Sequence, residues 1–122
     1  MTEEAAWSAL FAELDRWGTA GKRLDLWLRD DDATVPSDQL DRLAALADRF
    51  AIPVLLASIP LLAQETLARR LETMAWLRPC QHGVWHRNHA PSGEKKSEFG
   101  LDRPPPRFVA ASAAGWERLQ DL

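Results

Sequence analysis

The sequence predicts an α/β fold with about three parallel strands and flanking helices. Short apolar runs alternate with amphipathic helical segments, an order typical of strands joined by helical crossovers. The chain has 122 residues, of which 46% are hydrophobic and 27% are charged. This length and composition predict a single domain over residues 1–122 with one hydrophobic core.

The first helix and strand are predicted on either side of a glycine-containing turn. Apolar residues at helical spacing predict a helix from residue 3 to about residue 17, with Thr2 as its N-cap. Residues 24–29 form a short apolar run and predict a buried strand. The three acids at 30–32 follow directly, so they should lie at the strand's carboxyl end.

The next helix and strand carry stronger patterns. Ser37 can cap a helix that runs to about residue 50. Its inner face is predicted to consist of Leu40, Leu43, Ala44, Ala47 and Phe50. Residues 52–59 are apolar apart from Ser58, which predicts a strand covered on both faces.

The remainder of the chain predicts a helix, a strand, a loop and a final helix. Residues 62–75 have helical spacing, and residues 76–81 should form the third strand although Pro79 weakens that pattern. Residues 82–103 predict a long loop, a feature that is often functional in compact domains. The prolines at 104–106 begin a last helix with Phe108, Ser112, Trp116 and Leu119 facing inward.

Charge, cysteine content and hydropathy exclude several classes of protein. The net charge is −3 and both signs are spread along the chain, so no basic stripe indicates a nucleic-acid partner. No apolar stretch approaches the roughly 20 residues of a membrane span. The single cysteine, Cys80, suits a reducing compartment, and the acidic amino-terminal residues do not resemble a signal peptide. These features predict a cytoplasmic protein.

Two polar clusters follow predicted strands, at the edge where parallel α/β sheets bind ligands. The first is the acid triplet Asp30, Asp31 and Asp32. Three adjacent acids repel one another and need a cation, an arginine or water. Without further context, a solvated turn in which one aspartate caps the next helix is the alternative. Arg29 is expected to pair with the triplet.

The second cluster contains every histidine of the chain, between residues 82 and 89. His82 and His86 are four residues apart, and on a helical turn this spacing places both imidazoles on one side. Two histidines and one aspartate make a three-ligand metal site with open positions, the pattern of catalytic sites. A surface histidine pair without a ligand is the alternative.

These segments resemble the polysaccharide deacetylase family. Residues 28–33 are similar to its first motif, a strand that ends in an Asp-Asp pair, and residues 82–86 are similar to its second motif, two metal-binding histidines four apart. Residues 88–100 resemble a loop of a bacterial deacetylase-like branch. The resemblance covers about residues 20–103 and implies a partial (β/α) barrel of the deacetylase type.

The resemblance also implies roles for individual residues. Aligned with the family's pair, Asp31 is the catalytic base and Asp32 a metal ligand, together with His82 and His86. A register one residue earlier would give these two roles to Asp30 and Asp31. The implied cofactor is a divalent metal, with Zn²⁺ as the default, and the implied reaction is hydrolysis of an N-acyl (acetamido) C–N bond in a carbohydrate or small molecule. The residues that bind the substrate are not identified.

The length departs from the family, since a full (β/α) barrel usually takes about 250 residues. The chain matches only the amino-terminal half, without the histidine general acid and the arginine that orients the base in the family's second half. We expect one of three situations: a truncated product, a half-barrel completed by a second copy or a partner chain, or a stand-alone half-fold. The alternative function is therefore a catalytically inactive metal-binding half-barrel that acts as a binding or assembly module.

Overall fold

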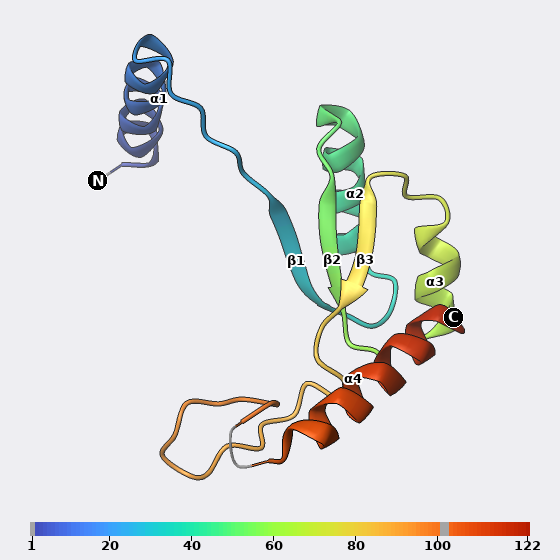
Figure 1. Ribbon diagram of the computed structural model, residues 1–122. Coiled ribbons are helices and arrows are strands. Elements are labelled where there is room, and N and C mark those ends of the chain that lie inside the picture. Colours follow the sequence, from blue (N-terminus) through green and yellow to red (C-terminus); the bar gives the residue numbers. More distant parts are fainter. Residues whose placement is uncertain (1, 101–102) are drawn as a thin grey trace.

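The computed structural model describes residues 2–100 and 103–122 as three strands and four helices (Figure 1). In chain order the elements are α1 (Glu3–Thr19), β1 (Leu28–Ala33), α2 (Asp38–Phe50), β2 (Val54–Ser58), α3 (Glu65–Leu71), β3 (Leu77–Gln81) and α4 (Pro105–Gln120). The long segment between β3 and α4 contains neither helix nor strand in its described part, as expected. Two residues of that expected loop, 101 and 102, lie outside the described residues.

The three strands form one parallel sheet in the order β1-β2-β3, which confirms the predicted α/β class. Leu56 of β2 is paired with Asp30 of β1 and with Pro79 of β3. Side chains at paired positions point to the same side of a sheet. Because all three strands run parallel, their carboxyl ends meet at one edge of the sheet. This arrangement brings the two polar clusters together.

The core lies on one face of the sheet, where β2 packs against α2 and α3. Val54 and Leu56 are fully buried, together with Leu40, Ala47 and Leu67 from the two helices. Burying a side chain such as Leu56 stabilises the fold by about 1.5–3 kcal/mol. The expectation that this central strand is buried is confirmed, since four of its five residues are buried, and Leu55 is half-buried.

Local signals determine where the helices begin. The side chains of Thr2 and Ser37 accept hydrogen bonds from the backbone N–H groups of Ala5 and Leu40, at 3.4 and 3.1 Å, so both predicted caps are confirmed. By contrast, α3 is shorter than the predicted range of 62–75. The backbone N–H of Gln64 donates to the carbonyl of Thr34 at 2.9 Å, and this bond holds the preceding residues in a turn.

The prediction for β1 is wrong in position and in burial. The strand begins at Leu28, so the acid triplet lies within it rather than after it. Leu26 and Trp27 are 82% and 81% exposed and form no part of the ladder. The reason is topological: β1 is an edge strand, and in the described chain no neighbour lies against its outer edge.

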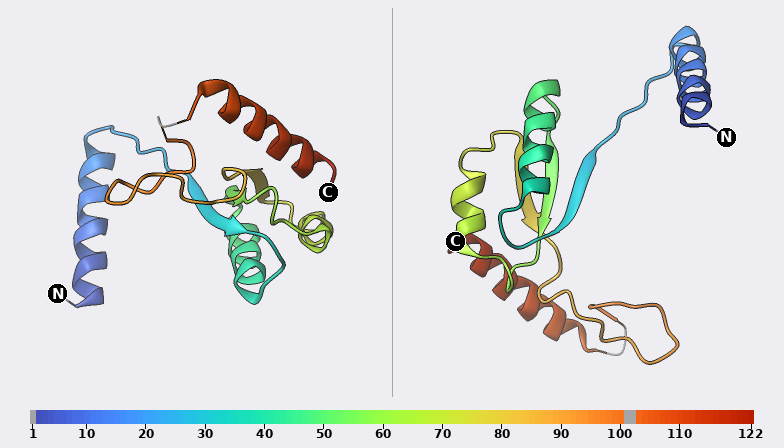
Figure 2. Two further views of the ribbon diagram at one scale, coloured as in Figure 1. Left: turned by 90° about the horizontal axis from the view of Figure 1, so that it is seen from below. Right: turned by 180° about the vertical axis from the view of Figure 1, so that it is seen from behind.

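The two terminal helices differ in how they meet the sheet. Helix α1 stands apart from the sheet at the end of an extended segment, and none of the residues Glu3–Thr19 is buried (Figures 1 and 2). Helix α4 contacts β3, and Gly115 permits this approach because a Cβ there would overlap the side chain of Gln81. Trp116, predicted to face inward, borders the space between α4 and β3 but remains 52% exposed.

Among the described residues, no helix combines the length and apolar character that a membrane crossing requires.

Candidate metal centre

A β-bulge positions Asp32 at the end of β1. The ladder pairs Asp31 with Ala57 and Ala33 with Ser58, which leaves Asp32 as an extra residue between them. Its φ is +71°, a left-handed conformation that aspartate adopts more readily than most residues. A bulge redirects the side chain that it carries, so Asp32 leaves the regular alternation of the strand.

The two histidines come from the loop that follows β3. The N–H of His82 donates to the carbonyl of Ser58 at 2.8 Å, which continues the β2–β3 ladder by one bond. Gly83 and His86 then adopt positive φ values of +59° and +54° and turn the chain back on itself. The expected helical turn does not form here, yet the two imidazole centroids lie 4.9 Å apart.

These three side chains converge on one point. The Nε2 of His82 lies 3.1 Å from Oδ1 of Asp32, and the Nδ1 of His86 lies 3.4 Å from the same oxygen. One potential ligand atom from each residue lies within 4.8 Å of the other two. Metal–ligand bonds of about 2.0–2.1 Å at tetrahedral angles place neighbouring ligand atoms about 3.3 Å apart. The two distances from Oδ1 of Asp32 are close to this value, so the group could hold a divalent metal ion.

The exposure of the three residues also fits an open coordination site. The side chains of Asp32, His82 and His86 are 53%, 23% and 50% exposed. Two imidazole nitrogens and one carboxylate oxygen are donors that zinc accepts, and three protein ligands leave room for water or substrate. Among the described residues these three are the group whose geometry could hold a metal ion.

Asp31 lies beside this group and is held by Arg29. The Nε of Arg29 lies 2.6 Å from Oδ1 of Asp31, and a guanidinium NH2 donates to Oδ2 at 2.7 Å, which is a bidentate pairing. Hydrogen bonding from Arg29 lowers the pKa of Asp31 below its ordinary value of 3.8, and the nearby histidines act in the same direction. Asp31 is therefore a charged carboxylate at neutral pH. The expected pairing of Arg29 with the triplet is confirmed.

The structure distinguishes the three acids of the triplet. Asp32 joins the histidines, Asp31 is paired with Arg29, and Asp30 is paired in the ladder with Leu56, whose side chain is in the core. Asp30 thus lies on the side of the sheet that α2 covers, where the triplet borders a cavity of about 490 Å³ with residues of α2. Of the three acids, Asp32 is thus the one that lies with the two histidines.

Other residues of the second cluster lie outside this group. His89 is not part of it, and its backbone N–H donates to the carbonyl of Ser97 at 2.8 Å. Trp85 is 42% exposed, with the guanidinium of Arg87 at 4.9 Å from its ring centroid. Glu98 makes a contact that the sequence patterns do not predict. Its carboxylate accepts hydrogen bonds from backbone N–H groups 12 to 14 residues earlier, in the histidine loop, residues 82–86.

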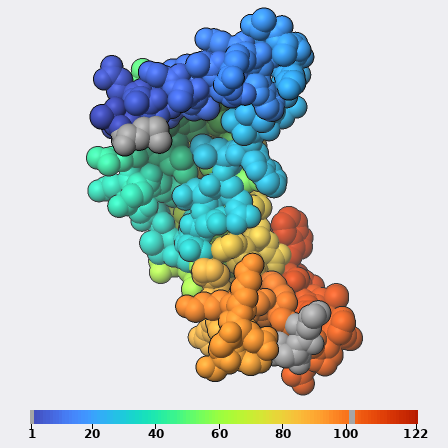
Figure 3. All heavy atoms as spheres, turned by 90° about the vertical axis from the view of Figure 1, so that its left-hand side faces the viewer, coloured from blue at the N-terminus to red at the C-terminus, as the bar shows by residue number. Residues whose placement is uncertain are grey.

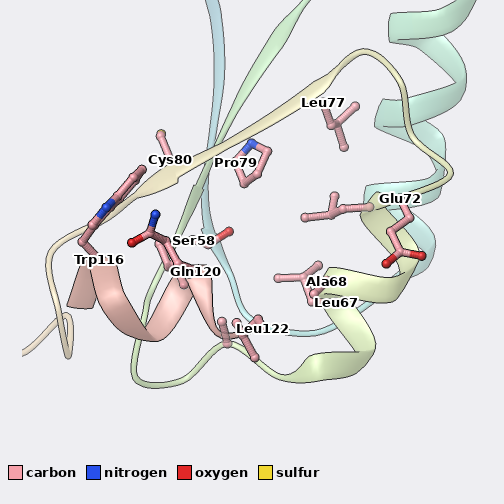
Figure 4. A pocket seen from close by; sticks show the side chains of 13 residues that line it. Ser58, Leu67, Ala68, Glu72, Leu77, Pro79, Cys80, Trp116, Gln120 and Leu122 are labelled. Atoms are coloured by element: carbon pink, nitrogen blue, oxygen red, sulfur yellow. The ribbon is translucent and has the colours of Figure 1, made fainter. Parts of the chain in front are cut away.

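A separate apolar cavity of about 370 Å³ lies between β3, α3 and α4 (Figure 4). Leu67, Leu77 and Trp116 border it, whereas none of the three candidate ligands does. Its polar groups include the hydroxyl of Ser58, which is buried and makes no hydrogen bond within the described structure. This cavity has no cluster of ligands or bases, so the chemistry is concentrated at the carboxyl ends of β1 and β3.

The comparisons with known proteins do not assign the chain to a family. No protein-family model, no curated protein and no solved structure matches it.

Proposed function

We propose that the chain is a polysaccharide deacetylase-like, metal-dependent hydrolase that cleaves the C–N bond of an N-acyl (acetamido) compound. The observation that carries the proposal is the convergence of Asp32, His82 and His86 beside a second carboxylate, Asp31. A metal centre with three protein ligands and an adjacent carboxylate is the arrangement needed to activate water against an amide. The resemblance of residues 28–33 and 82–86 to the two family motifs supports this assignment.

In this proposal the metal is divalent, with zinc as the default, and Asp32, His82 and His86 would hold it. When bound, such an ion supplies Lewis-acid polarisation of the amide carbonyl and a lowered pKa for water. Asp31 acts as the base and accepts a proton from the attacking water at one of its carboxylate oxygens. The net reaction adds water across the C–N bond and releases a carboxylic acid and an amine.

Arg29 has a positioning role in the same proposal. Its bidentate contact fixes both oxygens of Asp31 and keeps the pKa of that carboxyl low, so the base is present in its charged form. In the family an arginine from the second half of the barrel orients the base. Arg29 provides a comparable contact from β1 itself, two residues before Asp31.

The substrate class follows from the chemistry and from the composition. The single cysteine suits a reducing compartment, so we place the protein in the cytoplasm and favour a carbohydrate or smaller N-acyl compound found there. The cavities beside the candidate ligands, one bordered by the acid triplet and one by residues 86–88 and 96–98, offer space for its parts.

A second candidate function is a catalytically inactive metal-binding module that assembles with another chain. Exposed apolar side chains favour it, among them Trp7, Phe11, Leu26 and Trp27. Large exposed apolar side chains are typical of interaction sites where they gather in one patch. This candidate keeps the metal centre but predicts no turnover of any acetamido compound, together with a stable oligomer.

The test of the leading proposal combines zinc binding with hydrolysis of a panel of acetamido sugars. Asp31→Asn should abolish hydrolysis and leave zinc affinity nearly unchanged, because this residue is not one of the three ligands. Glu94→Gln, an exposed carboxylate on the loop, is the matched control and should retain both properties. Zinc binding without hydrolysis in the wild type, combined with a stable dimer in solution, would instead support the inactive module.

A further inference from the structure

The carboxylate of Glu98 is enclosed by the backbone of the histidine loop. The N–H of Trp85 donates to its Oε1 at 2.8 Å, the N–H of His86 donates to its Oε2 at 3.2 Å, and the N–H of Val84 lies 3.2 and 3.1 Å from the two oxygens. Three successive amides around one anion form a concave site of the kind that binds free anions in other loops. Here the anion is a side chain of the same chain.

The conformation of the loop depends on this contact. Gly83 has a φ of +59°, and a Cβ at that position would overlap the Glu98 carboxylate. The carboxylate therefore lies directly against the glycine that begins the turn. His86, at the other end of the turn, also has a positive φ, so the segment between the two histidines is bent at both ends.

A second set of hydrogen bonds holds Glu98 in place. The Oδ1 of Asn88 accepts hydrogen bonds from the N–H groups of Ala90 and Ser97, at 3.1 and 2.9 Å, and the N–H of His89 donates to the carbonyl of Ser97 at 2.8 Å. These bonds bring residue 97 back beside residues 88 and 89. Glu98 follows at once and is thereby directed toward the histidine loop. The loop lies at the opposite end from α1 on the face shown in Figure 3.

We infer that Glu98 is a positioning residue for the metal centre, whose carboxylate fixes the loop that carries His86. The inference rests on the proposed metal binding. His82 is anchored independently, since its backbone continues the β2–β3 ladder, whereas His86 lies at the far bend of a segment without regular secondary structure. Glu98 acts through the backbone and is not among the three residues whose atoms converge.

The test compares Glu98→Gln and Glu98→Ala with the control Glu94→Gln in a zinc competition titration against a chromophoric chelator. Loss of a group that orients a ligand typically weakens metal affinity about 10- to 100-fold. We expect a loss in this range for Glu98→Ala, a smaller loss for Glu98→Gln because one acceptor oxygen remains, and a change of less than about twofold for Glu94→Gln. Wild-type affinity in both Glu98 variants would overturn the inference.

Amide hydrogen exchange of the zinc-free protein separates this inference from the proposed function. Glu98→Gln should accelerate exchange at Val84, Trp85 and His86, and leave the amide of His82 unchanged because it is bonded to Ser58. If the wild type binds no zinc but Glu98→Gln still accelerates exchange at these three amides, the proposed function fails and the ordering role of Glu98 stands. Unchanged exchange at all three amides would overturn the ordering role itself.

Discussion

The two sides of the candidate metal centre are supported in different ways. Asp32 is carried by a strand, and its position follows from the ladder that pairs β1 with β2 on both sides of the bulge. His86 is carried by an irregular loop, whose bend depends on one carboxylate that returns from Glu98. His82 lies between these cases, because it leaves β3 directly and keeps a ladder hydrogen bond.

This difference indicates that the strand side of the centre is held more firmly than the loop side. On the strand side, the backbone hydrogen bonds between β1 and β2 together hold Asp32 in position. On the loop side, removal of a single side chain releases three amides at once. Substitutions on the two sides should therefore differ in what they disturb, and the following predictions are ordered from the largest expected effect to the smallest.

The largest effect is expected from removing a ligand on either side. Asp32→Ala and His82→Ala should each weaken zinc binding by roughly 100-fold or more, beyond the 10- to 100-fold typical of residues that only orient ligands. His89→Ala is the matched control, since His89 lies outside the converging group. A competition titration measures the affinities, and circular dichroism checks that each variant remains folded. Equal affinity in the ligand variants and in the control would contradict the assignment.

A smaller effect is expected at the glycine that begins the loop. Gly83→Ala places a Cβ where the Glu98 carboxylate lies and holds an alanine at a φ of +59°. The left-handed conformation alone costs about 1–2 kcal/mol for a residue with a Cβ. We expect lower stability in chemical denaturation and a loss of zinc affinity comparable with that of Glu98→Ala.

The control for this variant is Gly93→Ala. Gly93 also has a positive φ, but a Cβ there would meet no other atom within 4 Å. It should lower stability without changing zinc affinity. If both glycine variants bind zinc equally well, the loop conformation is not important for the centre.

The smallest effect is expected at Arg29, which acts on the strand side through Asp31. Arg29→Gln removes the hydrogen bonds that lower the pKa of Asp31, so this pKa should rise toward its ordinary value of 3.8. A depressed pKa stabilises the folded state above pH 3.8, and this contribution is lost as the pH falls through the folded-state pKa. Arg29→Gln should therefore weaken the pH dependence of stability below that value.

An NMR titration that follows the side-chain carboxyl of Asp31 measures the shift. Arg23→Gln is the control, because Arg23 is paired with Asp25 and not with the triplet. The same Asp31 pKa in wild type and Arg29→Gln would show that the bidentate contact does not form in solution.

The sequence predicts well those elements whose signals are local. Helix α2 begins at its cap, Ser37, and ends at residue 50 as expected, and β2 is recognisable because four of its five residues are apolar. The order of the strands alone predicts that the acid triplet and the histidine pair lie at one edge of the sheet. Asp32, His82 and His86 do meet there, although on a bulge and a loop rather than a helical turn.

The features that the sequence does not predict depend on distant partners. The strand β1 starts at Leu28 because pairing with β2 begins there, and the apolar residues before it do not reveal this limit. Trp116 follows the helical pattern of α4 but faces an incompletely covered side. The contact of Glu98 with the histidine loop spans an irregular segment, for which no periodic signal exists.

The most direct test of the central claim is an equilibrium zinc titration of the wild-type chain at neutral pH, beside a variant in which Asp32, His82 and His86 are all replaced by alanine. The account predicts about one Zn²⁺ per wild-type chain, because the three ligands form one site, and no specific binding by the triple variant. Absence of binding by the folded wild type, or equal binding by the triple variant, would contradict it.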